Sequence, residues 1–346
     1  MSTTTRKQTP GKYRAVQAIA PGKLELTEKS LIDPPAGFVR IKIEACGVCH
    51  SDSATVEGGF SVDYPRVPGH EVVGSIDKLG DGVKGWSVGD RVGVGFLGGN
   101  CGHCICCRGG DLVNCRNQEY TGVHHDGGYA EVMIAKHTGL ISIPDDLLSV
   151  DAAPLLCAGL TTFNALRNAP VKAGDLVAVI GIGGLGHLGV QYARHMGFEV
   201  VAIARGADKE ELARRLGAHH YIDSTATDPA AALQVLGGAK LILTTASSGK
   251  TVASTVKGLR ETGRMLVVGV SLEPLDVTDD VLVFGGRTVA GSLTGDSAAG
   301  DMTLKFSVLS GISAMIETMP LDKAPEAYAK MMAGKARFRM VLTMQS

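Results

Sequence analysis

Short hydrophobic runs that alternate with polar residues characterise the chain from residue 13 to about residue 150. The clearest runs lie at residues 39–43, 71–76, 91–94 and 129–134. Their two-residue period is that of half-buried strands, and Gly and Pro residues separate them. The pattern predicts an antiparallel barrel or sandwich in this part of the chain.

From residue 176 onwards the pattern changes to continuous apolar strands followed by amphipathic helices. Residues 176–180 form an uninterrupted apolar run, typical of a strand buried in a parallel sheet. We expect helices at about 187–196 and 209–216, and strands at 199–203, 241–245, 265–270 and 287–290. Right-handed crossovers would place these strands in one doubly wound parallel sheet, so the fold class is α/β.

The length of the chain predicts two domains. At 346 residues it exceeds the size at which a single hydrophobic core stops growing. We assign residues 1–155 to the mostly β domain and residues 156–290 to the parallel α/β domain. A helix at 324–332 and a strand at 337–343 are expected beyond them. Part of residues 291–346 should return to the first domain.

Three residues distant in sequence have the side chains that zinc binds most readily. They are Cys49, His70 and Cys157. Three protein ligands leave one tetrahedral position open, which distinguishes a catalytic zinc from a structural one. Asp52 and Glu71 lie close to these ligands in sequence, where carboxylates orient ligands or approach the metal. The alternative is that Cys49 and Cys157 are buried thiols and His70 is a core residue.

A second group of cysteines is closely spaced along the chain. Cys101, Cys104, Cys107 and Cys115 have the spacing C-x2-C-x2-C-x7-C, which folds a loop around a tetrahedral zinc closed to solvent. Cys106 does not fit this spacing and is expected to point away. A nucleic-acid-binding zinc ribbon was the alternative, but Arg108 and Arg116 are too few for a basic binding face.

A glycine-rich turn follows the strand at 176–180. Gly181, Gly183 and Gly186 form the pattern G-x-G-x-x-G between a strand and a helix, with Gly184 and Leu185 completing the turn. This context predicts a dinucleotide site with the pyrophosphate at the helix N-terminus. Residues 93–98 match the same pattern but lead into the cysteine loop, so we interpret them as a turn.

The residues after the second strand bear on the choice of coenzyme. Position 204 is Ala, where an acidic residue would bind the ribose 2′-hydroxyl, and position 205 is Arg. Arginine attracts a 2′-phosphate, so NADP is the predicted coenzyme. The alternative is NAD, with Arg205 solvated and Asp208 or the backbone contacting the ribose.

Composition and charge exclude several classes. A net charge of −1 gives no global field for nucleic acid or an anionic membrane, and no apolar run reaches membrane-spanning length. Eight clustered cysteines indicate metal binding in a reducing compartment rather than a disulfide scaffold. Residues 1–12 lack the apolar segment of a secretory signal. A cytoplasmic location is therefore expected.

Together these motifs resemble those of the zinc-dependent medium-chain alcohol dehydrogenases, and most closely the yeast-type enzymes. The resemblance runs from about residue 13 to residue 343 and rests on motifs in family order. These motifs are residues 47–52, 69–71, the four-cysteine loop, residues 157–159 and residues 181–186. The resemblance implies a GroES-like catalytic domain, a Rossmann coenzyme domain, an active site in the cleft between them, and a dimer or tetramer.

The resemblance also implies residue roles. Cys49, His70 and Cys157 would hold the catalytic zinc, with Glu71 able to approach it, and Cys101, Cys104, Cys107 and Cys115 would hold the structural zinc. Ser51 would accept the proton of the alcohol, and we include His50 and Asp52 in the catalytic set. His50 and Arg339 would meet the coenzyme pyrophosphate, and Thr161 and Val268 would lie beside the nicotinamide.

The implied reaction is hydride transfer between an alcohol and NAD(P), with zinc lowering the pKa of the alcohol. Three positions depart from the family pattern. Ala54 replaces the distal proton-relay histidine, and Phe60 and Phe96 replace pocket tryptophans, which favours longer or aromatic alcohols. Two other readings are a zinc-free quinone-reductase relative and a coenzyme-binding sensor without catalysis. The intact ligand cysteines argue against the first, and Ser51 with the ligands argues against the second.

Overall fold

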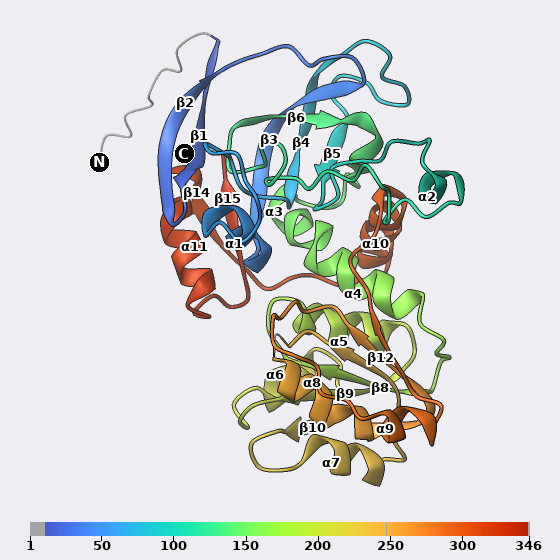
Figure 1. Cartoon of the computed structure of the whole chain (residues 1–346). Helices are drawn as coiled ribbons and strands as arrows, with labels where there is room; N and C mark the ends of the chain where they lie inside the picture. The colour runs from blue at the N-terminus through green and yellow to red at the C-terminus, as the bar shows by residue number, and fades with distance from the viewer. Residues whose placement is uncertain (1–10, 247, 345–346) are drawn as a thin grey trace. The chain divides into compact units, whose positions relative to one another are not determined.

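The computed structural model describes residues 11–246 and 248–344, so most of the segment 1–12 lies outside the described residues. The chain divides into two compact units (Figure 1). Unit 1 comprises Met1–Cys157, Asp296–Lys305 and Met315–Ser346, and unit 2 comprises Ala158–Gly295 and Phe306–Ala314. The observed division falls after Cys157, two residues beyond the predicted one, and residues 291–295 and 306–314 join unit 2.

Unit 1 is built mainly of strands. They are β1 (Lys12–Ala20), β2 (Lys23–Ser30), β3 (Phe38–Val48), β4 (Val72–Leu79), β5 (Arg91–Val94), β6 (Val132–Lys136), β7 (Leu140–Ser142), β14 (Ile316–Pro320) and β15 (Arg339–Thr343). Its helices are α1 (Ser53–Val56), α2 (Ile105–Arg108), α3 (Ser149–Ala152) and α11 (Ala324–Met332), with short 3-10 turns that include η1 (His50–Asp52) and η3 (Ala153–Leu156).

The main sheet of unit 1 has the order β14-β15-β3-β4-β5-β7, and β6 also pairs with β3. All its pairs are antiparallel except β14 with β15. Alternate residues of β3, such as Val39, Ile41 and Ile43, point into one apolar core. The C-terminal strand β15 pairs with β3 at residues 45–48, so the end of the chain supports the segment that leads to Cys49.

Unit 2 alternates strands with helices. Its strands are β8 (Leu176–Ile180), β9 (Glu199–Ala204), β10 (His220–Asp223), β11 (Ala239–Thr244), β12 (Leu259–Val267) and β13 (Thr288–Gly291). Its helices are α4 (Ala158–Arg167), α5 (Gly186–His195), α6 (Glu210–Arg215), α7 (Pro229–Val235), α8 (Gly249–Thr255) and α9 (Asp279–Val283). Helix α10 (Ser297–Ser310) is divided between the two units.

All the strands of unit 2 are parallel, in the order β10-β9-β8-β11-β12-β13. Helices cover both faces of this sheet. On one face Leu233 of α7 and Val252 of α8 join a core with Ala178 and Ile242. On the other face α5 approaches so closely that a Cβ at Gly189 would lie 3.2 Å from Leu243. This is the doubly wound topology, which binds ligands at the carboxyl ends of the strands on either side of the point where the order reverses.

The observed elements agree with the expected ones where the pattern was local and continuous. Strands β8 and β9 and helix α11 lie where expected, and β6 begins three residues later than the expected strand. The short strand β10 was not expected, because residues 220–223 carry two polar side chains within four positions. No helix follows residues 93–98 directly, which agrees with their interpretation as a turn.

Candidate metal centres and coenzyme pocket

Cys49, His70 and Cys157 come together in unit 1. Cys49 directly follows β3, His70 precedes β4, and Cys157 follows η3. One ligand atom from each of these residues and from Glu71 lies within 4.8 Å of the others, and the two sulfur atoms are 3.8 Å apart. The hydrogen bond from the Cys157 thiol lowers the pKa of the Cys49 thiol well below its ordinary value, although burial acts in the opposite direction. A lowered thiol pKa favours the thiolate, the form in which cysteine binds a metal.

Asp52 contacts one ring nitrogen of His70. Its Oδ1 lies 2.8 Å from Nδ1 of His70, and its Oδ2 accepts bonds from the Cys49 backbone N–H and the Tyr129 hydroxyl. Among the described residues, Nε2 of His70 is buried without a hydrogen-bond partner. A buried nitrogen of this kind requires a partner. A carboxylate on one ring nitrogen with the other nitrogen directed at sulfur ligands is the usual environment of a metal-binding histidine, so the donor set fits zinc.

Glu71 and Arg339 form a buried ion pair beside these ligands. One oxygen of Glu71 binds the Arg339 guanidinium, and the other oxygen is buried without a hydrogen-bond partner in the described part of the chain. Burial raises the pKa of Glu71 to about 7, although Arg339 acts in the opposite direction. Gly47 makes room for this carboxylate, since a Cβ there would lie 1.8 Å from it. The pyrophosphate contact expected of Arg339 stays a prediction.

An aromatic ladder extends from the ring of His70. Phe96 packs edge-on against His70 at 5.1 Å, Tyr120 stacks on Phe96 at 4.7 Å, and Tyr120 also stacks on His124 at 5.2 Å and on Phe60 at 6.5 Å. Phe60 is 50% exposed. The predicted aromatic positions 60 and 96 therefore lie in one stack next to a candidate zinc ligand, joined by Tyr120.

The predicted proton acceptor and its neighbour lie in the 3-10 turn η1, directly after Cys49. The residues His50 and Ser51 are exposed there, whereas Asp52 is buried. This turn places the Ser51 hydroxyl two residues from a candidate zinc ligand. Asp52, which we included in the catalytic set, positions Cys49 and His70 through its hydrogen bonds. The roles of His50 and Ser51 stay predictions.

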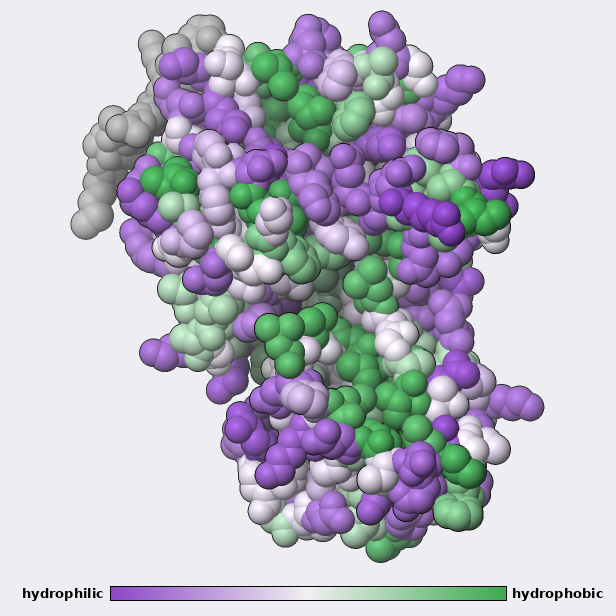
Figure 2. All heavy atoms as spheres, in the orientation of Figure 1, coloured by the Kyte–Doolittle hydropathy of each residue, from purple (hydrophilic) through white to green (hydrophobic). Residues whose placement is uncertain are grey.

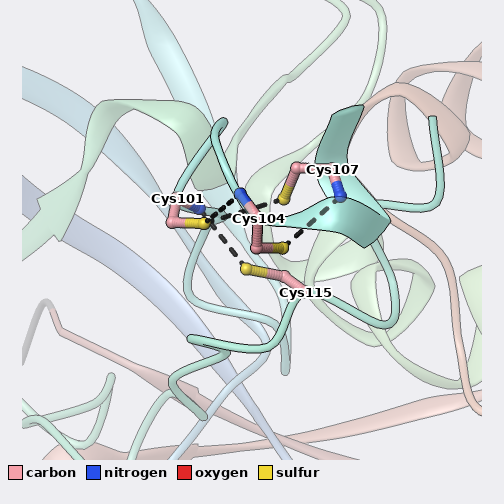
Figure 3. Close-up of side chains that lie close together, drawn as sticks. All are labelled: Cys101, Cys104, Cys107 and Cys115. Atoms are coloured by element: carbon pink, nitrogen blue, oxygen red, sulfur yellow. Dashed lines mark hydrogen bonds between the residues drawn. The ribbon is translucent and has the colours of Figure 1, made fainter. Parts of the chain in front are cut away.

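The four cysteines of the second group surround a common centre (Figure 3). They are Cys101, Cys104, Cys107 and Cys115, and their sulfur atoms lie within 4.8 Å of one another. Backbone N–H groups donate to the sulfurs, from Cys104 to Cys101 at 3.4 Å and from Cys107 to Cys104 at 3.5 Å. Cys106 is not part of this group.

The surroundings shift the pKa values of Cys101 and Cys107 in opposite directions. The backbone N–H of His103 is the first of several donors that lower the pKa of Cys101 to about 5. Desolvation, followed by neighbouring thiols, raises the pKa of Cys107 to about 12. A bound divalent cation removes this penalty by holding all four sulfurs as thiolates, so this donor set also fits zinc.

Unit 2 contains a pocket of about 710 Å³ at the carboxyl ends of its strands. The pocket is lined by residues that follow β8, β9, β10 and β11, among them Gly181, Gly183, Gly184, Leu185, Ala204, Arg205, Lys209, Ser224, Thr225 and Thr245. Gly181 has a φ of +88°, and a Cβ at Gly186 would lie 1.7 Å from the carbonyl oxygen of Gly181. Only glycine fits both positions, which brings the N-terminus of α5 to the pocket.

The other predicted coenzyme residues of unit 2 are distributed around this region. The side chain of Arg205 is exposed and makes no hydrogen bond or ion pair within residues 11–246 and 248–344. Thr161 is buried, and its hydroxyl donates to Thr294 at 3.2 Å. The backbone N–H of Val268 donates to Thr244 at 3.1 Å. The nicotinamide contacts of Thr161 and Val268 stay predictions.

Sequence reasoning missed three residues around the Cys49 site. Tyr129 supports Asp52 from a position 77 residues away, and Tyr120 and His124 extend the aromatic ladder. Tyr120 lies five positions after Cys115, and this closeness to the cysteine loop was the one local signal that could have pointed to it. The spacing of Tyr129 carried no such signal, because its contact depends on the folded sheet.

Comparisons with known proteins agree with this fold. The model of the alcohol dehydrogenase GroES-like domain matches residues 35–145, and that of the zinc-binding dehydrogenase matches residues 184–307. An alcohol dehydrogenase of Penicillium expansum is 41% identical over 97% of this chain and 99% of its own length.

Two solved structures share the fold. A cinnamyl alcohol dehydrogenase of Sorghum bicolor is 30% identical with a TM-score of 0.87, over 96% of this chain and 97% of the other. The CAD of Helicobacter pylori, complexed with NADP(H), is 29% identical with a TM-score of 0.85, over 96% and 98%.

The chain belongs to the zinc-type medium-chain alcohol dehydrogenase family. Its fold is the GroES-like domain joined to a Rossmann-type parallel sheet, as predicted, and its function is that of a dehydrogenase. The reading as a coenzyme-binding sensor is not favoured. The closer resemblance to the yeast-type enzymes stays a prediction.

Proposed function

We propose that this chain is a zinc-dependent alcohol dehydrogenase and aldehyde reductase that prefers NADP and aromatic or longer alcohols. The observation that carries the proposal is the buried group of Cys49, His70 and Cys157, with Asp52 on one nitrogen of His70 and the other nitrogen without a partner. Three ligands would leave one position for the substrate oxygen. A second zinc would be held by the four-cysteine loop.

The residues of this chain have distinct tasks in the proposed reaction. A zinc held by Cys49, His70 and Cys157 supplies Lewis-acid polarisation of the substrate oxygen. Ser51 accepts the proton of the alcohol, and the Gly181–Gly186 turn holds the coenzyme pyrophosphate. A nicotinamide coenzyme bound there would accept or supply the hydride. In the reductive direction the same residues serve a carbonyl substrate and return the proton.

Support for aromatic substrates comes from the ladder formed by Phe60, Phe96, Tyr120 and His124. It begins 5.1 Å from the ring of His70 and presents flat apolar faces, on which an aromatic ring stacks favourably. The similar Sorghum bicolor protein is a cinnamyl alcohol dehydrogenase, which is consistent with a substrate of this class.

The test is a set of initial rates with benzyl alcohol and with a short aliphatic alcohol, each with NAD and with NADP, together with the zinc content per subunit. Two zincs with faster turnover of benzyl alcohol and NADP support the proposal. Two zincs with a clear preference for NAD would retain the enzyme and contradict the NADP assignment. A single zinc and no turnover of any alcohol or aldehyde would contradict the enzyme assignment itself.

Removing Arg205 should weaken NADP binding selectively. A charge-assisted hydrogen bond contributes roughly 1.5–3 kcal/mol, so Arg205→Ala is expected to raise the KM for NADP by about 10- to 100-fold. The KM for NAD should stay within about twofold, since NAD lacks the 2′-phosphate that attracts the guanidinium. Steady-state kinetics with both coenzymes measure the effect.

Arg215 is the matched control for this variant. It lies on α6, pairs with Glu211 and does not line the pocket. Arg215→Ala should leave both KM values unchanged. Equal KM increases for NAD and NADP in Arg205→Ala would show that Arg205 does not bind the 2′-phosphate.

Removing the charge of Asp52 should weaken zinc binding at the Cys49 site. A carboxylate hydrogen-bonded to a metal-binding histidine typically contributes about 10- to 100-fold in metal affinity, so Asp52→Asn is expected to lower zinc affinity by about that factor. Chelator titration followed by metal analysis measures it. Tyr129→Phe removes one hydrogen bond to Asp52 and keeps the charge, so it should have a smaller effect. Unchanged zinc retention in Asp52→Asn would contradict the role of Asp52.

Self-association is also proposed. Strand β13 lies at the edge of the parallel sheet and, among the described residues, pairs with β12 alone. Large apolar side chains near this edge are strongly exposed, including Val270, Leu272, Val283 and Phe284, and Figure 2 shows apolar residues gathered on part of the visible surface of this unit. Open edges and apolar patches favour pairing with another chain. The expected assembly is a dimer or a tetramer, and the cytoplasmic location also stays a prediction. Among the described residues no helix has both the length and the apolar composition needed to cross a membrane.

A further inference from the structure

Two side chains of β10 hold the backbone of the turn that follows β9. The Oδ1 atom of Asp223 accepts a hydrogen bond from the backbone N–H of Gly206 at 2.8 Å. The hydroxyl of Tyr221 donates to the carbonyl oxygen of the same residue at 2.5 Å. Both polar backbone groups of Gly206 are therefore bound by a strand more than ten positions away in sequence.

The turn at Gly206 directly follows Arg205. Gly206 has a φ of +78°, a left-handed conformation that ends the extended path of β9. On the other side of Arg205, the carbonyl oxygen of Ala204 accepts bonds from the backbone N–H and the hydroxyl of Ser224, at 2.9 and 3.2 Å. Arg205 is thus held between two fixed neighbours, while its own side chain is exposed at the pocket.

Asp223 accepts further hydrogen bonds besides the one from Gly206. Its Oδ1 also accepts the backbone N–H of Thr225 at 2.8 Å and the Thr225 hydroxyl at 2.7 Å. The Thr225 hydroxyl is the largest of several donors that hold the pKa of Asp223 below its ordinary value. Because three donors converge on one oxygen, the carboxylate is held in the orientation that binds Gly206.

Neither Tyr221 nor Asp223 lines the pocket, whereas Arg205, Lys209 and Thr225 do. We propose that Tyr221 and Asp223 are positioning residues for coenzyme selectivity, which hold the Arg205 turn in the conformation that binds the 2′-phosphate of NADP. This inference rests on the proposed NADP preference and goes beyond it, because it assigns the selectivity to residues that act through Arg205.

The variants are expected to raise the KM for NADP and to leave the KM for NAD nearly unchanged. Releasing Gly206 lets the Arg205 guanidinium sample more orientations, so part of its binding energy is lost as conformational entropy. The pyrophosphate is common to both coenzymes and binds at the Gly181–Gly186 turn, which these bonds do not touch. Tyr221→Phe should raise the KM for NADP several-fold, and Asp223→Ala by about tenfold, which corresponds to the net contribution of a typical hydrogen bond. The KM for NAD and kcat should stay within about twofold in both variants.

A double-mutant cycle separates this role from a general structural one. If Tyr221 acts through Arg205, the pair Arg205→Ala/Tyr221→Phe should show no larger KM for NADP than Arg205→Ala alone. Asp223→Asn retains one acceptor oxygen and should recover part of the affinity lost in Asp223→Ala. Glu199→Gln is the control, since Glu199 pairs with His220 at the opposite end of the same two strands and lies outside the pocket.

The outcomes distinguish this inference from the proposed function. Selective weakening of NADP by the variants of Tyr221 and Asp223, without additivity to Arg205→Ala, supports it. Provided that Arg205→Ala still raises the KM for NADP, three results would overturn the inference. They are an effect of the Tyr221 variant that adds to that of Arg205→Ala, an equal rise in KM for both coenzymes, and an unchanged KM for NADP in the variants of Tyr221 and Asp223. An unchanged ratio of the two KM values in Arg205→Ala would overturn both the NADP assignment and this inference.

Discussion

Cys49→Ala is expected to abolish turnover while coenzyme binding persists. The Cys49 sulfur lies 3.8 Å from that of Cys157, in a group whose remaining histidine nitrogen has no other partner among the described residues. Loss of one of three protein ligands should release the metal or leave it misplaced. Because Lewis-acid stabilisation is worth several kcal/mol, kcat should fall by on the order of a thousandfold or more.

Coenzyme binding should survive this substitution because the coenzyme pocket is lined by residues of unit 2, whereas Cys49 belongs to unit 1. Titration with NADPH, followed by fluorescence, measures binding independently of activity. Zinc analysis should show one zinc fewer per subunit than in the unmodified protein.

Cys46 provides a matched control for Cys49. It is a fully buried thiol in β3, three positions before Cys49, and it is not part of the metal-binding group. Cys46→Ala should therefore retain both zincs and most of the activity. Full activity in Cys49→Ala, or equal losses of activity in Cys49→Ala and Cys46→Ala, would contradict the assignment of Cys49 as a zinc ligand.

Cys104→Ser should destabilise unit 1. The sulfur of Cys104 accepts backbone N–H groups from Cys107 and Arg116 in addition to facing the other three sulfurs. Loss of a bound metal belongs to the few mechanisms that cost more than about 4 kcal/mol. The loop contains one short helix, α2, and has little regular structure that would hold it together without a metal. Thermal unfolding and zinc analysis measure the loss.

Cys106 tests whether this effect is specific. It lies on α2 between Cys104 and Cys107 and is outside the four-sulfur group. Cys106→Ser should leave zinc content and the unfolding temperature unchanged. Unaltered melting and zinc content in Cys104→Ser as well would argue against a structural metal site.

The sequence by itself determined the features whose physical cause is local. The spacing from Cys101 to Cys115 brings four sulfurs together within one loop, so the candidate site could be predicted without knowledge of the fold. The strand, glycine turn and helix at residues 176–195 were equally predictable, because Gly181 and Gly186 satisfy constraints imposed by their own neighbours.

The Cys49 site was predicted in a different way. Residue types indicated the ligands, but Cys157 lies 108 positions from Cys49, so their proximity depended on family resemblance until the structure brought them together. Local periodicity carries no information on which distant segments pack against each other.

Only the tertiary structure decided the partners of these residues. Tyr129 reaches Asp52 across 77 positions, and Arg339 reaches Glu71 across 268, because β6 and β15 both pair with β3. Tyr221 and Asp223 acquire their contacts with Gly206 because β10 pairs in parallel with β9. Strand pairing of this kind is a cooperative, long-range property of the folded chain, so the groups that orient the ligands and the Arg205 turn are defined by the sheets rather than by any short stretch of sequence.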